Sequence, residues 1–103
     1  MKKIFIAAFM IVSSFGTNVM ADGHAIKMGI ILGFTGPIES LTPAMAGSAE
    51  LAFKEASDSG SLLGGKKIEV IRADSTCVDS AAATAAAEGV IAQGVAAIMG
   101  ADC

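Results

Sequence analysis

Three apolar stretches follow the first two dozen residues of the chain, and each has the pattern of a β-strand. Residues 25–34 form a nearly continuous apolar run with one lysine, which is typical of a strand buried on both faces of a parallel sheet. Residues 67–73 alternate in part between apolar and charged side chains, and this pattern predicts a more exposed edge strand. Residues 95–99 predict a third strand, which is short and apolar.

A helical pattern fills the interval between the first two strands. Thr42 is expected to cap this helix, with Pro43 in its first turn and the polar residues 57–60 at its end. Glu50 and Lys54 are spaced as an ion pair one turn apart. The packing face is predicted to consist of five side chains at helical spacing: Met45, Ala49, Ala52, Phe53 and Ala56.

A second helix is predicted over residues 81–93, because the many alanines of this segment favour helix. Asp79 or Ser80 is placed to cap its start, and Gly94 to end it. The packing face of this helix is expected to contain Ala86, Val90 and Ile91.

The alternation of strands and helices predicts an α/β fold with a parallel β-α-β-α-β sheet, right-handed crossovers and helices on both faces. Open parallel sheets bind ligands outside the carboxyl ends of their strands. In this chain, those ends carry the loops that begin near residues 33, 74 and 100. Three strands form about half of a doubly wound domain, so we expect residues 22–103 to be the N-terminal portion of a larger one.

The first 21 residues have the three-part build of a secretory signal peptide. A basic start precedes nine apolar residues at positions 4–12, and a more polar segment ends at Ala21. A membrane anchor is the alternative, but a bilayer-spanning helix needs about 20 apolar residues. We therefore expect export, with cleavage after Ala21.

Charge and motifs exclude several classes of function. After residue 21, five basic and ten acidic side chains give a formal net charge of −5, which argues against nucleic acid and anionic membranes as partners. The glycine spacing matches neither a dinucleotide-binding fingerprint nor a P-loop. His24 is the only histidine and lies near the expected new N-terminus, so no Ser-His-Asp set is available. We expect no enzymatic activity, no cofactor and no metal site.

Cys77 and Cys103 are the only cysteines, and each follows a predicted strand. In an exported protein two cysteines usually form a disulfide, because the compartment is oxidising. A catalytic thiol or half of a metal site is the alternative, but the sequence has no CxxC motif and no histidine spaced for zinc. A bond between Cys77 and Cys103 would join neighbouring loops at the ligand edge of the sheet.

The order and spacing of four segments resemble the opening of the Leu/Ile/Val-binding protein family. These segments are IKMGIILGFTGP, GSAELAFKEAS, GGKKIEVIRADSTCVDSAAATAAAEGVI and GVAAIMGADC. Members are periplasmic substrate-binding proteins of branched-chain amino acid ABC transporters, with the type I periplasmic-binding fold. The resemblance implies a periplasmic location, two lobes around a small ligand, residues 22–103 in the first lobe, and a disulfide between Cys77 and Cys103.

The resemblance also implies site residues and partners. Leu41 matches a position, often aromatic, that touches the side chain of the ligand, and Asp102 and Cys103 match the wall of the pocket. Because Asp102 brings a carboxylate to this wall, a polar or cationic solute is an alternative to a branched-chain amino acid. The implied partners are an amino acid or similar solute and the membrane permease of an ABC importer, and the full-length protein is expected to be a monomer. The 103-residue chain alone is expected to bind no amino acid with useful affinity.

Two other functions stay open at this stage. A ligand-binding domain of an exported sensor or receptor with the same fold would signal instead of delivering its solute. A secreted α/β enzyme would need a nucleophile or a metal set, and nothing in the sequence hints at one.

Overall fold

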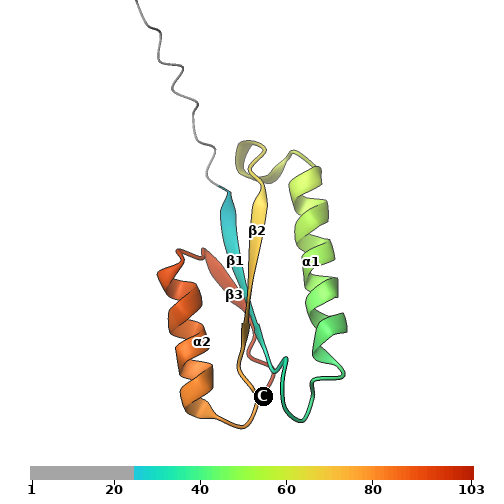
Figure 1. The fold of residues 1–103 in the computed structure, drawn as a ribbon. Coiled ribbons are helices and arrows are strands. Elements are labelled where there is room, and N and C mark those ends of the chain that lie inside the picture. Colours follow the sequence, from blue (N-terminus) through green and yellow to red (C-terminus); the bar gives the residue numbers. More distant parts are fainter. Residues whose placement is uncertain (1–24) are drawn as a thin grey trace, which may run out of the picture.

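The computed structural model describes residues 25–103, which form a three-stranded sheet between two helices (Figure 1). The elements follow in the order β1 (Ile26–Leu32), α1 (Thr42–Asp58), the 3-10 helix η1 (Leu62–Gly64), β2 (Ile68–Asp74), α2 (Ser80–Ala92) and β3 (Ala97–Met99). The predicted parallel β-α-β-α-β fold is confirmed. The predicted leader, with cleavage after Ala21, lies outside the described residues. Within residues 25–103, no helix is both long enough and apolar enough to cross a membrane.

The sheet has the strand order β2-β1-β3, so the most apolar strand lies in the middle. β1 pairs with β2 along its whole length, from Ile26 opposite Ile68 to Leu32 opposite Asp74. On the other side it pairs with β3, from Met28 to Ile30. The edge position predicted for β2 is therefore confirmed, and the third strand is shorter than its apolar run.

One face of the sheet packs against α1 through large side chains. Ile30, Leu32 and Ala46 are fully buried at its centre. The partly buried side chains around them are Phe34, Ala49, Phe53, Val70 and Met99. Ala46 is therefore the fully buried apolar residue of α1. The prediction of Met45 and Ala52 in the packing face is wrong, since Met45 is 41% exposed and Ala52 is also exposed.

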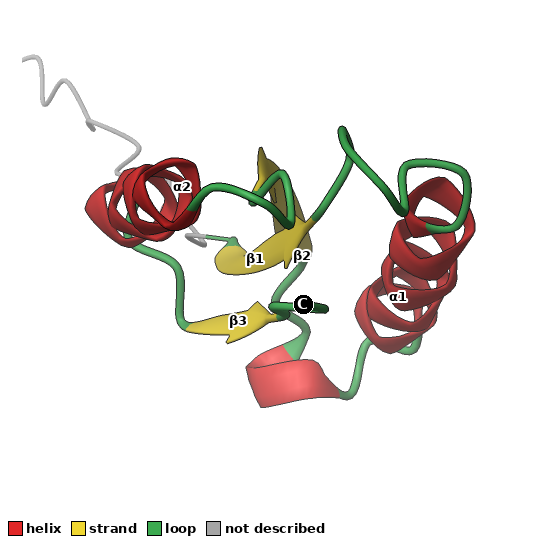
Figure 2. Ribbon diagram, turned by 90° about the horizontal axis from the view of Figure 1, so that it is seen from below, coloured by secondary structure: helices red, strands yellow, loops and turns green. Residues whose placement is uncertain are grey.

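The opposite face of the sheet packs against α2 at close range (Figure 2). Gly29 lies at this contact: a Cβ at this position would be in ordinary contact with Val90 of α2, at 3.5 Å, and in tighter contact with Ile98 of β3, at 3.2 Å. Val90 is fully buried, as predicted. Ile91 is 62% exposed, so its predicted place in the packing face is wrong.

The two helices begin in different ways. The predicted cap of α1 is wrong: Leu41 is at the N-cap position, and Thr42 is the first helical residue. The Thr42 hydroxyl instead donates a hydrogen bond to the carbonyl of Gly33, at 3.0 Å. The predicted cap of α2 is confirmed, because the Asp79 carboxylate accepts from the N–H groups of Ala81 and Ala82.

The exposed charges of α1 also form pairs that differ from the prediction. Glu50 does not pair with Lys54 but accepts two hydrogen bonds from Arg72 of β2, at 2.5 and 2.8 Å. The Arg72 guanidinium holds the pKa of Glu50 below its usual value. Lys54 pairs with Asp58, one turn further along the helix. Local spacing allowed the pair between Glu50 and Lys54, but a partner from another strand replaces it.

Candidate functional site

The loops that follow the three strands lie together at one end of the sheet, beside the starts of both helices (Figure 1). We refer to this end as the carboxyl end of the sheet. Parallel strands bring their carboxyl ends to one side, and the helices that follow them start there. This arrangement gives the candidate site its position.

Gly33 connects three of these segments. Its N–H donates to both carboxylate oxygens of Asp102, at 3.1 and 3.2 Å, and its carbonyl accepts from Thr42. The site requires a glycine here, because a Cβ would lie 2.9 Å from the sulfur of Cys77. The loop after β3 and the start of α1 are thereby fixed to the end of β1.

Asp74 joins the loops after β1 and β2. Its carboxylate accepts from the hydroxyl of Thr35 at 2.6 Å, from the N–H of Thr35 at 3.3 Å, and from the N–H of Thr76 at 2.8 Å. These hydrogen bonds hold the pKa of Asp74 below its usual value. The bond from the Thr35 hydroxyl contributes most, and the bond from the N–H of Thr76 is next. Asp74 therefore acts as a charged acceptor that orients both loops.

A disulfide between Cys77 and Cys103 joins the loops after β2 and β3. Their Cα atoms lie 5.4 Å apart, within the range that disulfides span. Thr76 and Cys77 both have left-handed backbone conformations, with φ of 61° and 67°, which turn the loop toward Cys103. Closing a loop of 26 residues contributes about 3 kcal/mol in the chain-entropy account.

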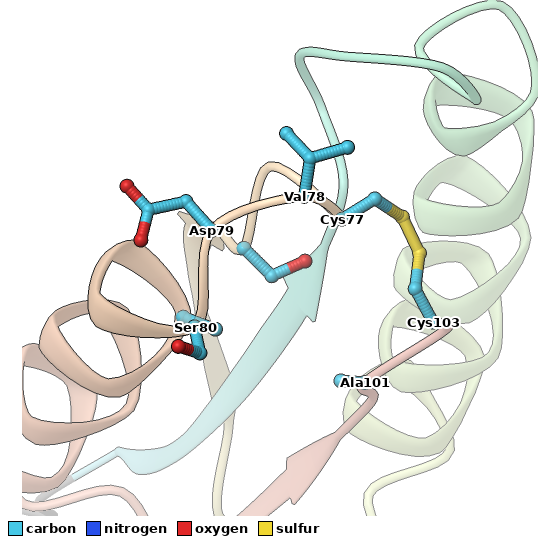
Figure 3. A pocket seen from close by; sticks show the side chains of 8 residues that line it. Cys77, Val78, Asp79, Ser80, Ala101 and Cys103 are labelled. Carbon is cyan, nitrogen blue, oxygen red and sulfur yellow. A yellow bond between two sulfur atoms is a disulfide. The ribbon is translucent and has the colours of Figure 1, made fainter.

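A hollow of about 400 Å³ lies between this disulfide and the start of α2 (Figure 3). Small and polar side chains line it together with the two cysteines: Ser75, Val78, Asp79, Ser80, Ala83 and Ala101. The Asp79 carboxylate is already engaged by the first N–H groups of α2. Of the three predicted ligand-binding residues, Cys103 lines this hollow, whereas Leu41 and Asp102 do not.

The three predicted ligand-binding residues lie in two separate segments: Asp102 and Cys103 follow one another after β3, and Leu41 directly precedes α1. Asp102 is half-buried, and its Oδ1 lies 3.3 Å from the sulfur of Cys103. Leu41 lies at the start of α1 with its side chain 59% exposed. Its neighbour Thr42 donates a hydrogen bond to the carbonyl of Gly33, and the N–H of Gly33 in turn donates to Asp102.

Two residues that organise this end were not singled out from the sequence. They are Gly33 and Asp74, which hold the loops through contacts over 69 and 39 positions of the chain. Their positions could have pointed to this role, because Gly33 and Asp74 stand at the ends of the first two strands, where the loops of the ligand edge begin.

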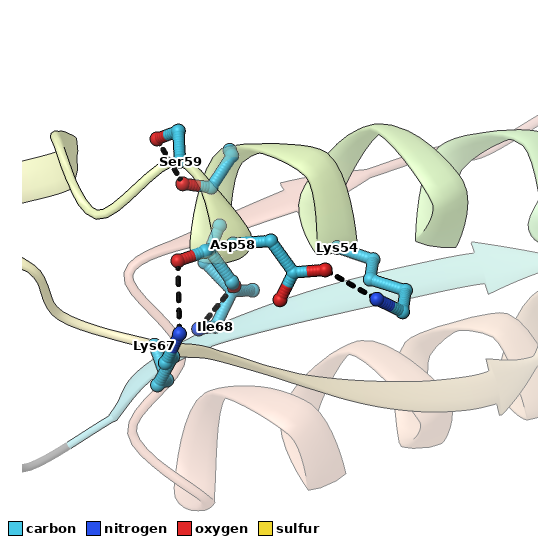
Figure 4. A network of polar contacts seen from close by, with 7 residues as sticks. Lys54, Asp58, Ser59, Lys67 and Ile68 are labelled. Atoms are coloured by element: carbon cyan, nitrogen blue, oxygen red, sulfur yellow. Dashed lines mark hydrogen bonds and ion pairs between the residues drawn. The ribbon is translucent and has the colours of Figure 1, made fainter.

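The amino end of the sheet has a different polar cluster (Figure 4). The Ser57 hydroxyl accepts from the N–H of Ile68 at 2.9 Å, and the Ser57 carbonyl accepts from the ammonium of Lys67 at 3.1 Å. A groove of about 480 Å³ runs here between α1 and β2. These polar groups bind one another, so the cluster serves to dock the end of α1 on β2.

Comparison with known families now identifies the chain. Residues 25–102 match the model of a family described as periplasmic binding protein. The chain belongs to the periplasmic binding protein family. A search of curated proteins gives no match to it.

Membership assigns a substrate-binding role to the chain. Periplasmic binding proteins bind small-molecule ligands, usually work with transporters, and are generally not enzymes. They act in the periplasm or outside the cell. The parallel sheet and its two helices are consistent with a fragment of the type I periplasmic-binding fold.

Proposed function

We propose that this chain belongs to the periplasmic substrate-binding component of an ABC importer for amino acids of the branched-chain type, or for related small solutes. The observation that carries the proposal is the family match over residues 25–102, on a sheet whose carboxyl-end loops are held together. Export with cleavage after Ala21 is part of the same proposal.

In this proposal the solute lies against the carboxyl end of the sheet and contacts Leu41, Asp102 and Cys103. The exposed Leu41 side chain supplies apolar surface for the solute, whose burial is favourable. Asp102 keeps its carboxylate toward the N–H of Gly33, and this contact lowers the cost of a negative charge near an aliphatic ligand. The arrangement is therefore compatible with a branched-chain amino acid.

The mechanism is binding without chemistry. A second lobe closes over the solute, and the solute stabilises the closed state because it binds that state more tightly than the open one. Rigid loops at the carboxyl end favour such closure, since less conformational entropy is lost when the ligand binds.

Calorimetric titration of the exported protein that contains this chain, with each of the twenty amino acids, tests the proposal. We expect one of them to bind with one-to-one stoichiometry and to be recovered unchanged. Leu41→Ala should weaken binding by about tenfold, because apolar contact with the solute is lost. Leu51→Ala is the matched control, since Leu51 is equally exposed but lies further along α1.

Two results would contradict the proposal. One is that neither an amino acid nor a related small solute binds, and the other is that the recovered ligand is chemically altered. Uptake of the labelled amino acid by cells, with and without the gene, then separates an importer from a sensor. Loss of uptake is expected of the importer component.

A further inference from the structure

The disulfide and Asp102 form a cluster of three side chains of the types that bind metal ions. The sulfur atoms of Cys77 and Cys103 and a carboxylate oxygen of Asp102 all lie within 4.8 Å of one another. In the oxidised protein the two sulfurs are bonded to each other, and they offer no thiolate to a metal ion. We propose that reduction of this disulfide converts the cluster into a Zn²⁺ site with two thiolates and one carboxylate.

The conversion has two balanced steps. A dithiol reductant gives two electrons and two protons to the sulfur–sulfur bond, which breaks into two thiols while the reductant closes into its own disulfide. Zn²⁺ then displaces the two thiol protons and binds both thiolates together with the Asp102 carboxylate. A water molecule fills the fourth position of the tetrahedron, as in zinc sites with three protein ligands.

The backbone already has the separation that such a site needs. The Cα atoms of Cys77 and Cys103 are 5.4 Å apart, so both side chains can reach one ion at the usual Zn–S distance of about 2.3 Å. Asp102 Oδ1 lies 3.9 Å from the sulfur of Cys77 and 3.3 Å from that of Cys103. Rotation of the side chains of Cys77, Asp102 and Cys103 would then place the three ligand atoms around one ion.

The surroundings support the third ligand and leave the site accessible. The N–H of Gly33 donates to the Asp102 carboxylate and orients it, as hydrogen bonds behind metal-binding carboxylates do. Cys103 is exposed, while Cys77 and Asp102 are half-buried, so a reductant and an ion can reach the sulfurs. Two thiolates select Zn²⁺ over Mg²⁺ or Ca²⁺, which prefer oxygen ligands.

The consequence is a second way to join the loops after β2 and β3. When the disulfide is intact, a covalent bond holds them together. When it is reduced, zinc restores the link between Cys77 and Cys103, and the carboxyl end of the sheet keeps its shape. This inference does not depend on which solute the protein binds.

Zinc titration of the purified chain, followed by competition with a chromogenic chelator, tests the proposal. The protein is reduced with a phosphine, which does not bind zinc as a dithiol would, and is compared with the oxidised protein. We expect the reduced protein to bind one equivalent of Zn²⁺ above the level of the double variant Cys77→Ser/Cys103→Ser. The oxidised protein should bind no more than that variant.

Substitution of the carboxylate makes the test specific. Asp102→Asn keeps the shape of the side chain and should weaken zinc binding by about tenfold or more. Loss of a residue that only hydrogen-bonds to a metal ligand already lowers metal affinity by about this factor. Glu88→Gln, at an exposed acid on α2, is the matched control and should change nothing. Co²⁺ in place of Zn²⁺ should give a sulfur-to-metal absorption band only in the reduced protein.

Two outcomes would overturn the proposal. In one, the reduced protein binds no more zinc than the double variant and gives no sulfur-to-cobalt band. In the other, zinc binds but Asp102→Asn and Glu88→Gln behave alike, as expected if an unfolded chain uses its two thiols without the carboxylate.

Discussion

The two ends of the sheet are both polar, but they are held together by different kinds of contact. At the carboxyl end, Gly33 binds Asp102 across 69 positions, and Thr35 binds Asp74 across 39. At the amino end, Ser57 binds Ile68 across 11 positions, and Lys54 pairs with Asp58 across four. The carboxyl-end contacts therefore join the loops after all three strands, whereas this amino-end cluster joins α1 to β2, which follow one another along the chain. A separate amino-end contact, from the Lys27 ammonium to the carbonyl of Gln93, spans 66 positions.

This difference is the basis of our proposal that the solute binds at the carboxyl end. Loops fixed by long-range contacts form a rigid edge that still exposes the side chain of Leu41. At the amino end, the hydroxyl and carbonyl of Ser57 and the ammonium of Lys67 are engaged in docking α1 on β2. Four changes can break or sharpen this contrast, and they are given in order of decreasing effect.

Loss of the disulfide should have the largest effect on the carboxyl end. Cys103→Ser should lower the free energy of unfolding by about 3 kcal/mol, because the unfolded chain gains the freedom that the cross-link removes. Cys77→Ser should cost the same amount. The double variant should cost no more than either single one when measured by urea unfolding, and additive losses would contradict the pairing.

A methyl group at Gly36 should be more harmful than one at Gly60. Both glycines have left-handed φ values, of 93° and 68°, but only at Gly36 would a Cβ collide with the carbonyl of Thr76. Gly36→Ala should destabilise by about 2–3 kcal/mol and Gly60→Ala by about 1 kcal/mol. Equal losses in thermal unfolding would show that the loops after β1 and β2 are not packed against each other.

Removal of the Ser57 hydroxyl should affect stability but not binding. Ser57→Ala leaves the N–H of Ile68 without its acceptor and should lower the free energy of unfolding by about 1–2 kcal/mol. Ser61→Ala, at an exposed position whose side chain makes no cap hydrogen bond, is the control and should cost less. A change in solute affinity on Ser57→Ala would mean that the amino end takes part in binding.

The smallest effect should be a dependence of stability on pH through Asp74. Hydrogen bonds from Thr35 and Thr76 hold the pKa of Asp74 below 3.8, so the folded state favours the charged carboxylate. Its contribution is complete at pH values above 3.8 and is lost as the pH falls through the lower pKa of the folded state. The stability difference between wild type and Asp74→Asn should shrink below pH 3.8 in urea titrations, and a constant difference would contradict this role.

The sequence predicted those features that depend on a residue and its near neighbours. The apolar run of β1, the edge pattern of β2 and the Asp79 cap of α2 are all local patterns, and all three are confirmed. Helix α2 could be predicted from its alanines, because alanine has the highest intrinsic helix propensity. The fold class followed from the order of these elements.

The features that were predicted wrongly involve competition from distant residues. Thr42 is a good capping residue, but its hydroxyl binds Gly33, and Glu50 is spaced for Lys54 but binds Arg72 from β2. Ile91 fits an apolar helix face, yet only Val90 reaches Gly29. Periodicity gives the spacing of side chains on a helix, but it does not say which partner the rest of the fold presents to each of them.

The central claim is that the carboxyl end of the sheet, and not the amino end, faces the solute. Hydrogen–deuterium exchange of the exported protein, with and without its tightest-binding amino acid, tests this most directly. The account predicts slower exchange in residues 33–41 and 100–103 on binding, and no change in residues 57–68. Protection confined to residues 57–68 would contradict it.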